Sequence, residues 1–325
     1  MSDPQHPTIP RMKLPICATN DSLHMDCLLE AFCSSRYGHA LLESAYHKGY
    51  RISLDHQGVK VPLAKYNDKK KIITLPAYMP DGMILMSLAM ALRGIAQDDI
   101  HIEDNARPNE KIYVIKHSDF YNPTSQILVN RLRKADQVVA AFDIAEEISK
   151  SGHASNMNPA TSMKTALDMH FIFVSNAYAE NIRNDPEKAR RDAFKAFYKE
   201  VAWLPSFDSL VLDRIEKMER KGFFKDDKAL LQRELAINNM SQTLEKSSIP
   251  YFNSSKIHFG VPPYNTINSS TKTRLKNILE RLKLPDDNIL YEDPDNSEEF
   301  AHVDNEDIRC PSVPRIDLKP EFSPK

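Results

Sequence analysis

The segment Met83–Gln97 reads MILMSLAMALRGIAQ, and its residues up to Leu92 are apolar except for Ser87. Because a helix that is apolar all round has to be covered by protein on every side, we expect a buried central helix here. Asp81 and Gly82 precede it, which is typical of a helix start. Since a bilayer span needs about 20 apolar residues, this run is too short to cross a membrane.

The flanking segments have the periodicities of further helices and of a small sheet. Alternating apolar and polar residues predict three strands, and polar turn residues at 67–71 would connect the last two. These strands are expected at 49–55, about 59–66 and 71–75. Helical spacing with cap and stop residues predicts the other elements. The expected helices span about 20–49, 123–151, 160–183, 187–202, 207–221, 227–246 and 270–284, with a short strand at 111–115.

These elements predict an α+β fold, in which long helices are the majority and a sheet of three or four strands lies beside the central helix. The chain has 325 residues, 41% of them apolar, which suffices for one large domain or two small ones. We expect an extended arm over 1–19, one main domain over 20–284 and a mostly disordered tail over 285–325. That tail holds 12 Asp and Glu against 4 Lys and Arg.

Charge and cysteine content argue against several classes of protein. The formal net charge of −2 gives no reason to expect nucleic-acid binding over the whole surface, and only 8 glycines argue against Gly-rich phosphate loops. The four cysteines show neither a CxxC pair nor zinc-finger spacing, so free thiols in a reducing compartment are expected. The first residues, MSDPQHP, lack the basic start and apolar stretch of a secretory signal. We therefore expect a cytoplasmic protein without a membrane segment.

Three blocks of the sequence occur in a specific order. Residues 88–97 read LAMALRGIAQ, residues 131–140 read RLRKADQVVA, and residues 190–198 read RRDAFKAFY, followed by FDSLVL at 207–212. In order and spacing these blocks resemble uncharacterised bacterial metallopeptidase domains of the zincin type, over roughly residues 35–215. In that family the first block lies on the central helix and carries His-Glu-x-x-His. The resemblance implies a zincin-like fold for the main domain.

The resemblance also implies where the family's metal chemistry would lie, and this sequence lacks it. The first His position is Met90, the Glu position is Ala91 and the second His position is Gly94. Two His at i and i+4 can hold Zn²⁺, and the Glu acts as general base for the metal-bound water. A thioether is a weak ligand for Zn²⁺, Gly has no side chain and Ala cannot accept a proton. We therefore predict no catalytic residue, no zinc and no other cofactor, although zinc is expected in the family.

The second block contains the family's candidate for a third metal ligand. The corresponding family segment reads roughly R-x-x-E-A-D-A-x-A, and the resemblance places its Glu at Lys134 in this sequence. A cation there would repel Zn²⁺ rather than bind it. The polar residues near the degenerate positions are predicted to line the former cleft. These residues are Arg93, Gln97 and Asp136.

Lys134 has two readings. If the metal cavity persists, the ammonium could take the place of the ion and pair with Asp136 or a neighbouring acid, since burying it unpaired is expensive. Alternatively, the helix is rotated and Lys134 extends to solvent. The distances among Lys134, Met90 and Gly94 distinguish the two.

The favoured hypothesis for function is a catalytically inactive, zincin-like protein whose former cleft binds a peptide or protein partner. A second hypothesis is an active hydrolase with a relocated site, which requires any three of six candidate side chains to converge within the reach of one metal ion. The candidates are His101, His117, His153, His170, Asp136 and Glu180. A third hypothesis is a plain helical interaction protein. It predicts that the helices at 83–97 and 123–151 do not pack across residues 90, 94 and 134.

Overall fold

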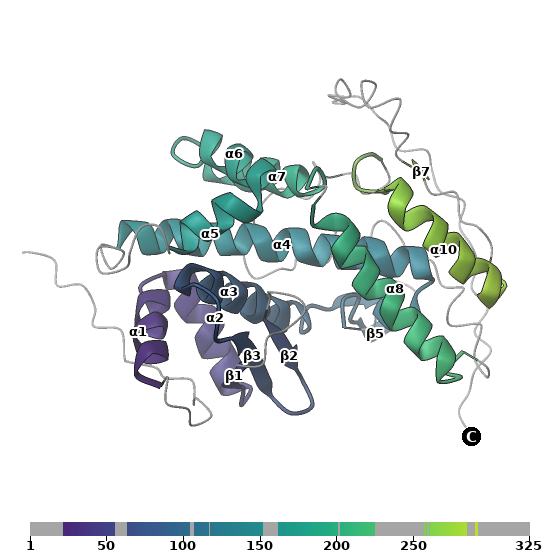
Figure 1. Cartoon of the computed structure of the whole chain (residues 1–325), viewed down its shortest axis with the longest axis horizontal. Helices are drawn as coiled ribbons and strands as arrows, with labels where there is room; N and C mark the ends of the chain where they lie inside the picture. Colours follow the sequence, from purple (N-terminus) through teal and green to yellow (C-terminus); the bar gives the residue numbers. More distant parts are fainter. Residues whose placement is uncertain are drawn as a thin grey trace, which may run out of the picture.

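A computed structural model of the chain describes residues 22–55, 64–104, 107–116, 118–151, 162–200, 202–224, 257, 259, 261–284 and 290–291. These residues form a mostly helical fold with a small three-stranded mixed sheet, which confirms the predicted α+β class. Helix α4 (Pro123–Lys150) runs along the long axis of the molecule (Figure 1). The sheet and α3 (Asp81–Gln97) lie on one side of it. On the other side lie α6 (Ile172–Asn181) and α7 (Pro186–Phe197), while α5 (Met163–His170) packs against both α3 and α4.

Helix α3 is the buried central helix that the apolar run predicts. Every residue from Gly82 to Ile95 is buried, and its neighbours are α1, α2, α4, α5 and two strands of the sheet. The helix begins two residues before the expected start, at Asp81 after Pro80. In the part of the chain that the structure describes, no helix is long and apolar enough to cross a membrane.

Helix α4 confirms the long helix expected at 123–151. The Asn122 side chain caps its start by accepting a hydrogen bond of 2.7 Å from the backbone N–H of Ser125, and Pro123 occupies the first turn. Buried residues lie on several faces of α4, because it is packed between the two halves of the fold. It therefore contributes side chains to more than one layer.

The sheet contains β1 (Arg51–Asp55), β2 (Lys65–Asn67) and β3 (Ile72–Pro76) in the order β1-β3-β2. β3 pairs in parallel with β1 and antiparallel with β2. Ile52 of β1 lies opposite Ile73 of β3, and both side chains are fully buried in the main core. β2 is thus an edge strand. The part of its predicted range at 59–63 lies outside the described residues.

Two of the predicted helices are interrupted, so these predictions were wrong in extent. The helix expected over 20–49 forms α1 (Ser22–Cys33) and α2 (Arg36–His47). Ser35 ends the first and caps the second, because its hydroxyl accepts the backbone N–H of Gly38 and donates to Glu147 of α4. The segment at 160–183 forms α5 and α6, since Phe171 between them has the non-helical angles φ −132° and ψ 65°. The Phe171 ring stacks on Trp203 at 5.5 Å.

A second, smaller core joins α4 to α8 (Leu204–Arg220) and α10 (Ser269–Leu282). The short strand expected at 111–115 is displaced, because β5 spans Arg107–Ile112 and pairs with β4 (Ile102–Asp104). A 3-10 helix at Ser118–Phe120 precedes α4. β6 (Thr266–Ile267) pairs in parallel with β7 (Leu290–Tyr291), so two residues of the predicted disordered tail form a strand. The arm at 1–19, the helix at 227–246 and the remaining tail lie outside the described residues.

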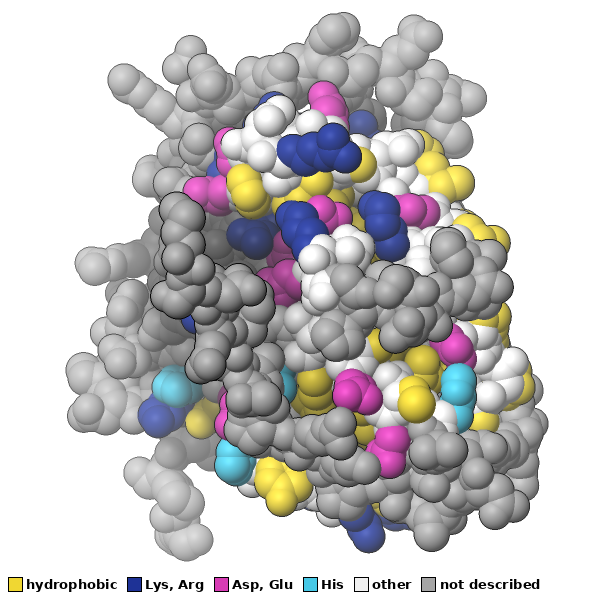
Figure 2. Space-filling model, turned by 90° about the vertical axis from the view of Figure 1, so that its left-hand side faces the viewer, with side chains coloured by type: hydrophobic (Ala, Val, Ile, Leu, Met, Phe, Trp, Pro, Cys, Tyr) yellow, Lys and Arg dark blue, Asp and Glu magenta, His cyan; other side chains and the backbone are white. Residues whose placement is uncertain are grey.

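Basic and acidic side chains are interspersed on the surface. Figure 2 shows this mixture over the upper half of one end of the molecule. On α7, for example, Arg191 pairs with Glu187 one turn away at 2.6 Å. The described part of this end therefore carries no broad region of one sign of charge.

Candidate functional site

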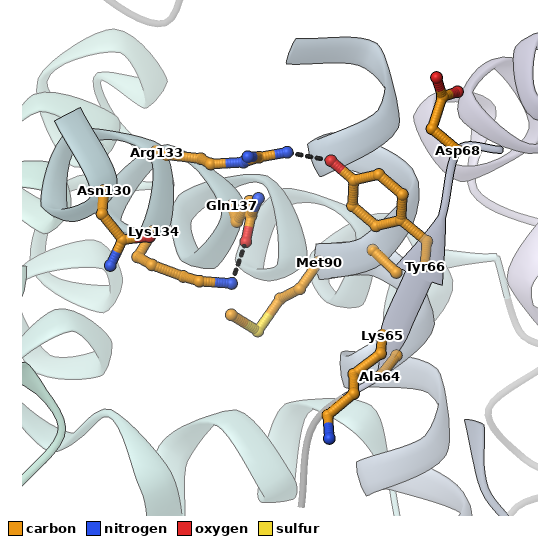
Figure 3. A pocket seen from close by; sticks show the side chains of 10 residues that line it. Ala64, Lys65, Tyr66, Asp68, Met90, Asn130, Arg133, Lys134 and Gln137 are labelled. Carbon is orange, nitrogen blue, oxygen red and sulfur yellow. Dashed lines mark hydrogen bonds between the residues drawn. The ribbon is translucent and has the colours of Figure 1, made fainter. Parts of the chain in front are cut away.

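A pocket of about 420 Å³ opens where β2, α3 and α4 meet (Figure 3). α4 contributes residues 130, 133, 134 and 137, which fall on one helix face because they are spaced three and four apart. α3 contributes two small or flexible apolar residues, and β2 with the residues beside it forms the opposite wall. The lining residues are Ala64, Lys65, Tyr66, Asp68, Met90, Ala91, Asn130, Arg133, Lys134 and Gln137.

The structure brings together the positions at which the family resemblance would place the metal site. Met90, Ala91 and Lys134 all line the pocket, with Met90 on α3 and Lys134 on α4 (Figure 3). Gly94 lies at the close approach of the helices, where a Cβ atom would stand 2.8 Å from Nε2 of Gln137. The two helices therefore pack across residues 90, 94 and 134, contrary to the packing expected for a plain helical protein.

Lys134 reaches into the pocket and bonds to a neutral partner. Its Nζ donates to Oε1 of Gln137 at 2.9 Å and lies 5.5 Å from the centre of the Phe207 ring. The pairing with Asp136 or a neighbouring acid, expected in one of the two readings of Lys134, does not form, and within the described residues Lys134 has no ion pair with a carboxylate. Burial, with a smaller contribution from the nearby Arg133 charge, lowers the pKa of the Lys134 amine to about 7.

The three residues expected to line the cleft form a buried cluster beneath the pocket instead. Asp136 Oδ2 accepts from Nε of Arg93 at 2.7 Å and from Nε2 of Gln97 at 2.5 Å, and all three side chains are almost fully inaccessible. Asp136 follows Lys134 by two positions, and residues two apart on a helix point to different faces. The cleft prediction for Arg93, Gln97 and Asp136 was therefore wrong.

This buried cluster nevertheless orients the pocket. An ionised carboxylate only accepts, so Asp136 holds the NH₂ group of Gln97 toward itself. The Gln97 oxygen then accepts from Nε2 of Gln137 at 3.0 Å, which leaves the Gln137 oxygen to face Lys134. The direction of each amide is thus set by its neighbour in the chain of hydrogen bonds.

Arg133 and Tyr66 close one rim of the pocket. Arg133 donates to the Tyr66 hydroxyl and to Oδ1 of Asp98 at 2.9 Å, and the Tyr66 hydroxyl donates to Oδ2 of Asp98 at 2.5 Å. Burial raises the pKa of Tyr66 far above its usual range, so the hydroxyl stays protonated at neutral pH. Because Asp98 also accepts directly from Arg133, the positive charge of Arg133 is largely offset by this carboxylate.

The alternative site built from histidines finds no support in the described residues. Among them, no three His, Cys, Asp or Glu side chains are grouped so that they could hold a metal ion. His170 contacts the Trp203 ring, and His101 lies against Tyr113. His117 and His153 lie outside the described residues.

Sequence reasoning missed most of the polar lining. The spacing of Asn130, Arg133, Lys134 and Gln137 was a usable signal, because four polar residues at i, i+3, i+4 and i+7 define one face of an otherwise buried helix. Tyr66 had no comparable signal. Its place in the pocket depends on the antiparallel pairing of β2 with β3, which is a tertiary contact.

We expect Lys134→Met to raise the free energy of unfolding by about 1–3 kcal/mol at pH 6. The pKa of a lysine in the unfolded chain is about 10, whereas the pKa of Lys134 in the folded protein is about 7. The unfolded state therefore binds the proton more tightly, and Lys134 lowers the free energy of unfolding by its full amount below pH 7. The stability gained by Lys134→Met should decrease between pH 7 and pH 10, because the unfolded lysine gains less and less from binding a proton as the pH approaches its own pKa. Urea titrations at pH 6 and pH 9 measure it. The matched control is the exposed Lys65→Met, which should change stability by less than about 0.5 kcal/mol.

Comparisons with protein-family models, curated proteins and solved structures found no match to this chain. The resemblance to zincin-type metallopeptidase domains therefore depends on the three sequence blocks and stays a prediction. What the site can do follows from the side chains that line it.

Proposed function

We propose that this protein is a zincin-like pseudoenzyme that binds a peptide or a protein segment in the pocket without hydrolysing it. The observation that carries the proposal is the meeting of Met90, Ala91 and Lys134 around one open pocket. These are the positions at which the family resemblance would require two of the metal ligands and the general base. An open pocket thus lies at the positions where the resemblance would place the catalytic groups, which supports binding there.

The residues present do not fit a catalytic zinc ion. Met90 offers a soft thioether, Ala91 has no group that could accept a proton from water, and Gly94 has no side chain. Lys134 would add a positive charge beside any bound dication. We therefore derive no hydrolytic step for this pocket, and we expect binding alone.

The position of β2 supports an extended peptide as the ligand. β2 is an edge strand, and no described strand pairs with its outer side. Lys65 and Tyr66 of β2 also line the pocket, so a peptide paired along this edge would place a side chain or its terminus inside. The volume of about 420 Å³ is within the range of small-ligand sites. We expect this binding to occur in the cytoplasm.

The test is a peptide-binding assay on the full chain, with mass spectrometry of the peptides and metal analysis of the protein. We expect peptides to bind without cleavage, and Ala64→Trp to weaken binding at least tenfold by filling the pocket rim. The matched control is Ala177→Trp on α6, which is similarly half-buried but does not line the pocket. Stoichiometric zinc together with a peptidase activity that a chelator removes would overturn the proposal.

A further inference from the structure

We infer that the group held in this pocket is a carboxylate, bound by the Lys134 ammonium, and that the ligand is a peptide that presents either a Glu side chain or its C-terminal carboxylate. The inference rests on the proposed function, because it names the ligand class of the same site. It follows from the charges that line the pocket, from the partners of each charge, and from the hydrogen-bond donors that remain.

The pocket has an excess of positive charge. Three basic side chains line it, and Asp68 is the one acidic residue among the lining side chains. Asp68 already accepts from the Tyr50 hydroxyl at 2.8 Å and pairs with Lys71 at 2.6 Å. These hydrogen bonds lower the pKa of Asp68, so its charge is both present and offset. It does not neutralise the pocket.

The three basic side chains differ in their partners. Arg133 is paired with Asp98. Lys65 and Lys134 have no carboxylate partner within the described residues, although Lys134 is the more enclosed of the two. A half-buried cation beside a neutral amide is costly, and a bound anion would offset that cost by ion pairing.

The remaining donors match a carboxylate. An ammonium has three N–H donors, and Lys134 uses one of them on Gln137. The other two can reach the oxygens of a carboxylate in the pocket, and Lys65 lies on the opposite wall with its ammonium directed away from Lys134 (Figure 3). Met90 and Ala91 offer an apolar surface for the methylene groups of a Glu side chain or for the last residue of a chain.

Binding should depend on pH through Lys134. The titratable groups around it are Arg133 on its own helix and Lys65, Asp68 and the neutral Tyr66 on the β2 side, while α3 presents Met90 and Ala91, which do not titrate. On α8, Asp208 is bonded to Arg131. With the pKa of Lys134 at about 7, affinity should fall about tenfold from pH 6 to pH 8, because the carboxylate stays ionised while the amine loses its proton.

The experiment uses three fluorescent peptides with the full chain. The first alternates Ala and Glu and has blocked ends, the second has Gln in place of Glu, and the third is the Gln peptide with a free C-terminal carboxylate. We expect the first or the third peptide to bind at least tenfold more tightly than the second. Preference for the first would show that the pocket binds a Glu side chain, and preference for the third that it binds the C-terminal carboxylate. Lys134→Gln should remove this preference, and the surface variant Lys69→Gln should keep it.

Equal binding of all three peptides, or a preference that survives Lys134→Gln, would overturn the inference. If binding is equal but still weakened by Ala64→Trp, peptide binding stands and carboxylate recognition fails. If no peptide binds, both proposals fail. Because Lys134 is expected to cost stability, its replacement should leave the chain folded, and the urea titration confirms that for the variant used.

Discussion

Asp136→Ala is expected to lower the free energy of unfolding by about 3–5 kcal/mol, because it removes a buried carboxylate that forms an ion pair with the Arg93 guanidinium. The side chains of Arg93 and Asp136 are 0% and 1% exposed, so water cannot replace the lost partner. Gln97 loses one of its two acceptors as well, so that only the backbone oxygen of Arg133, at 3.2 Å, still directs the amide that bonds to Gln137. Urea unfolding followed by circular dichroism measures the loss.

The control for Asp136 lies on the same helix. Glu146 pairs with the exposed Lys150 one turn away, and Glu146→Ala should cost less than about 1 kcal/mol. A double variant, Arg93→Met with Asp136→Leu, should recover most of the stability, because it removes both charges together. A loss below about 1 kcal/mol for Asp136→Ala would show that the pair contributes little.

Asp208→Ala is expected to have a similar effect, of about 3–5 kcal/mol, on the other side of α4. Asp208 receives two parallel hydrogen bonds from Arg131, at 2.9 and 2.5 Å, and a third at 3.0 Å from Thr271 of α10. Arg131 also donates to the backbone oxygen of Thr266 at 2.5 Å. The buried carboxylate of Asp208 on α8 therefore contacts α4 and α10 directly, and it is connected to β6 through Arg131.

The single tryptophan of the chain reports on this loss. Trp203 lies directly before α8, so its fluorescence follows the docking of that helix during urea unfolding. The control is Asp213→Ala, also on α8, where the side chain is largely exposed and pairs with Arg274. That variant should change stability by less than about 1 kcal/mol. Equal effects of the two variants would contradict a special role for Asp208.

The sequence was most informative for the longest elements. The apolar run of α3 and the Asn122-Pro123 start of α4 depend on local chemistry, and both helices form as expected. The interruptions at Ser35 and Phe171 were missed, because apolar spacing continues across them, although the local cap of Ser35 on Gly38 adds to its tertiary bond with Glu147. The parallel pairing of β1 with β3 likewise depends on the contacts of the finished fold.

For the site, the family resemblance placed Met90, Ala91 and Lys134 close together, and the structure does so too. It could not indicate which neighbouring residues face the pocket. Side chains two positions apart on a helix diverge, so Asp136 turns into the core while Lys134 lines the pocket.

Side chains at successive positions along α4 form hydrogen bonds with different elements of the fold. Arg131 bonds toward α8, Asp136 toward α3, Asp143 toward Tyr178 and Arg190, and Glu147 toward Ser35. Adding or deleting one residue in an α-helix turns everything beyond that point by about 100°. A single insertion between Asp136 and Asp143 would therefore put the second half of the helix out of phase with all its partners at once. We therefore expect insertions and deletions within this helix to be tolerated far less often than substitutions of its exposed residues.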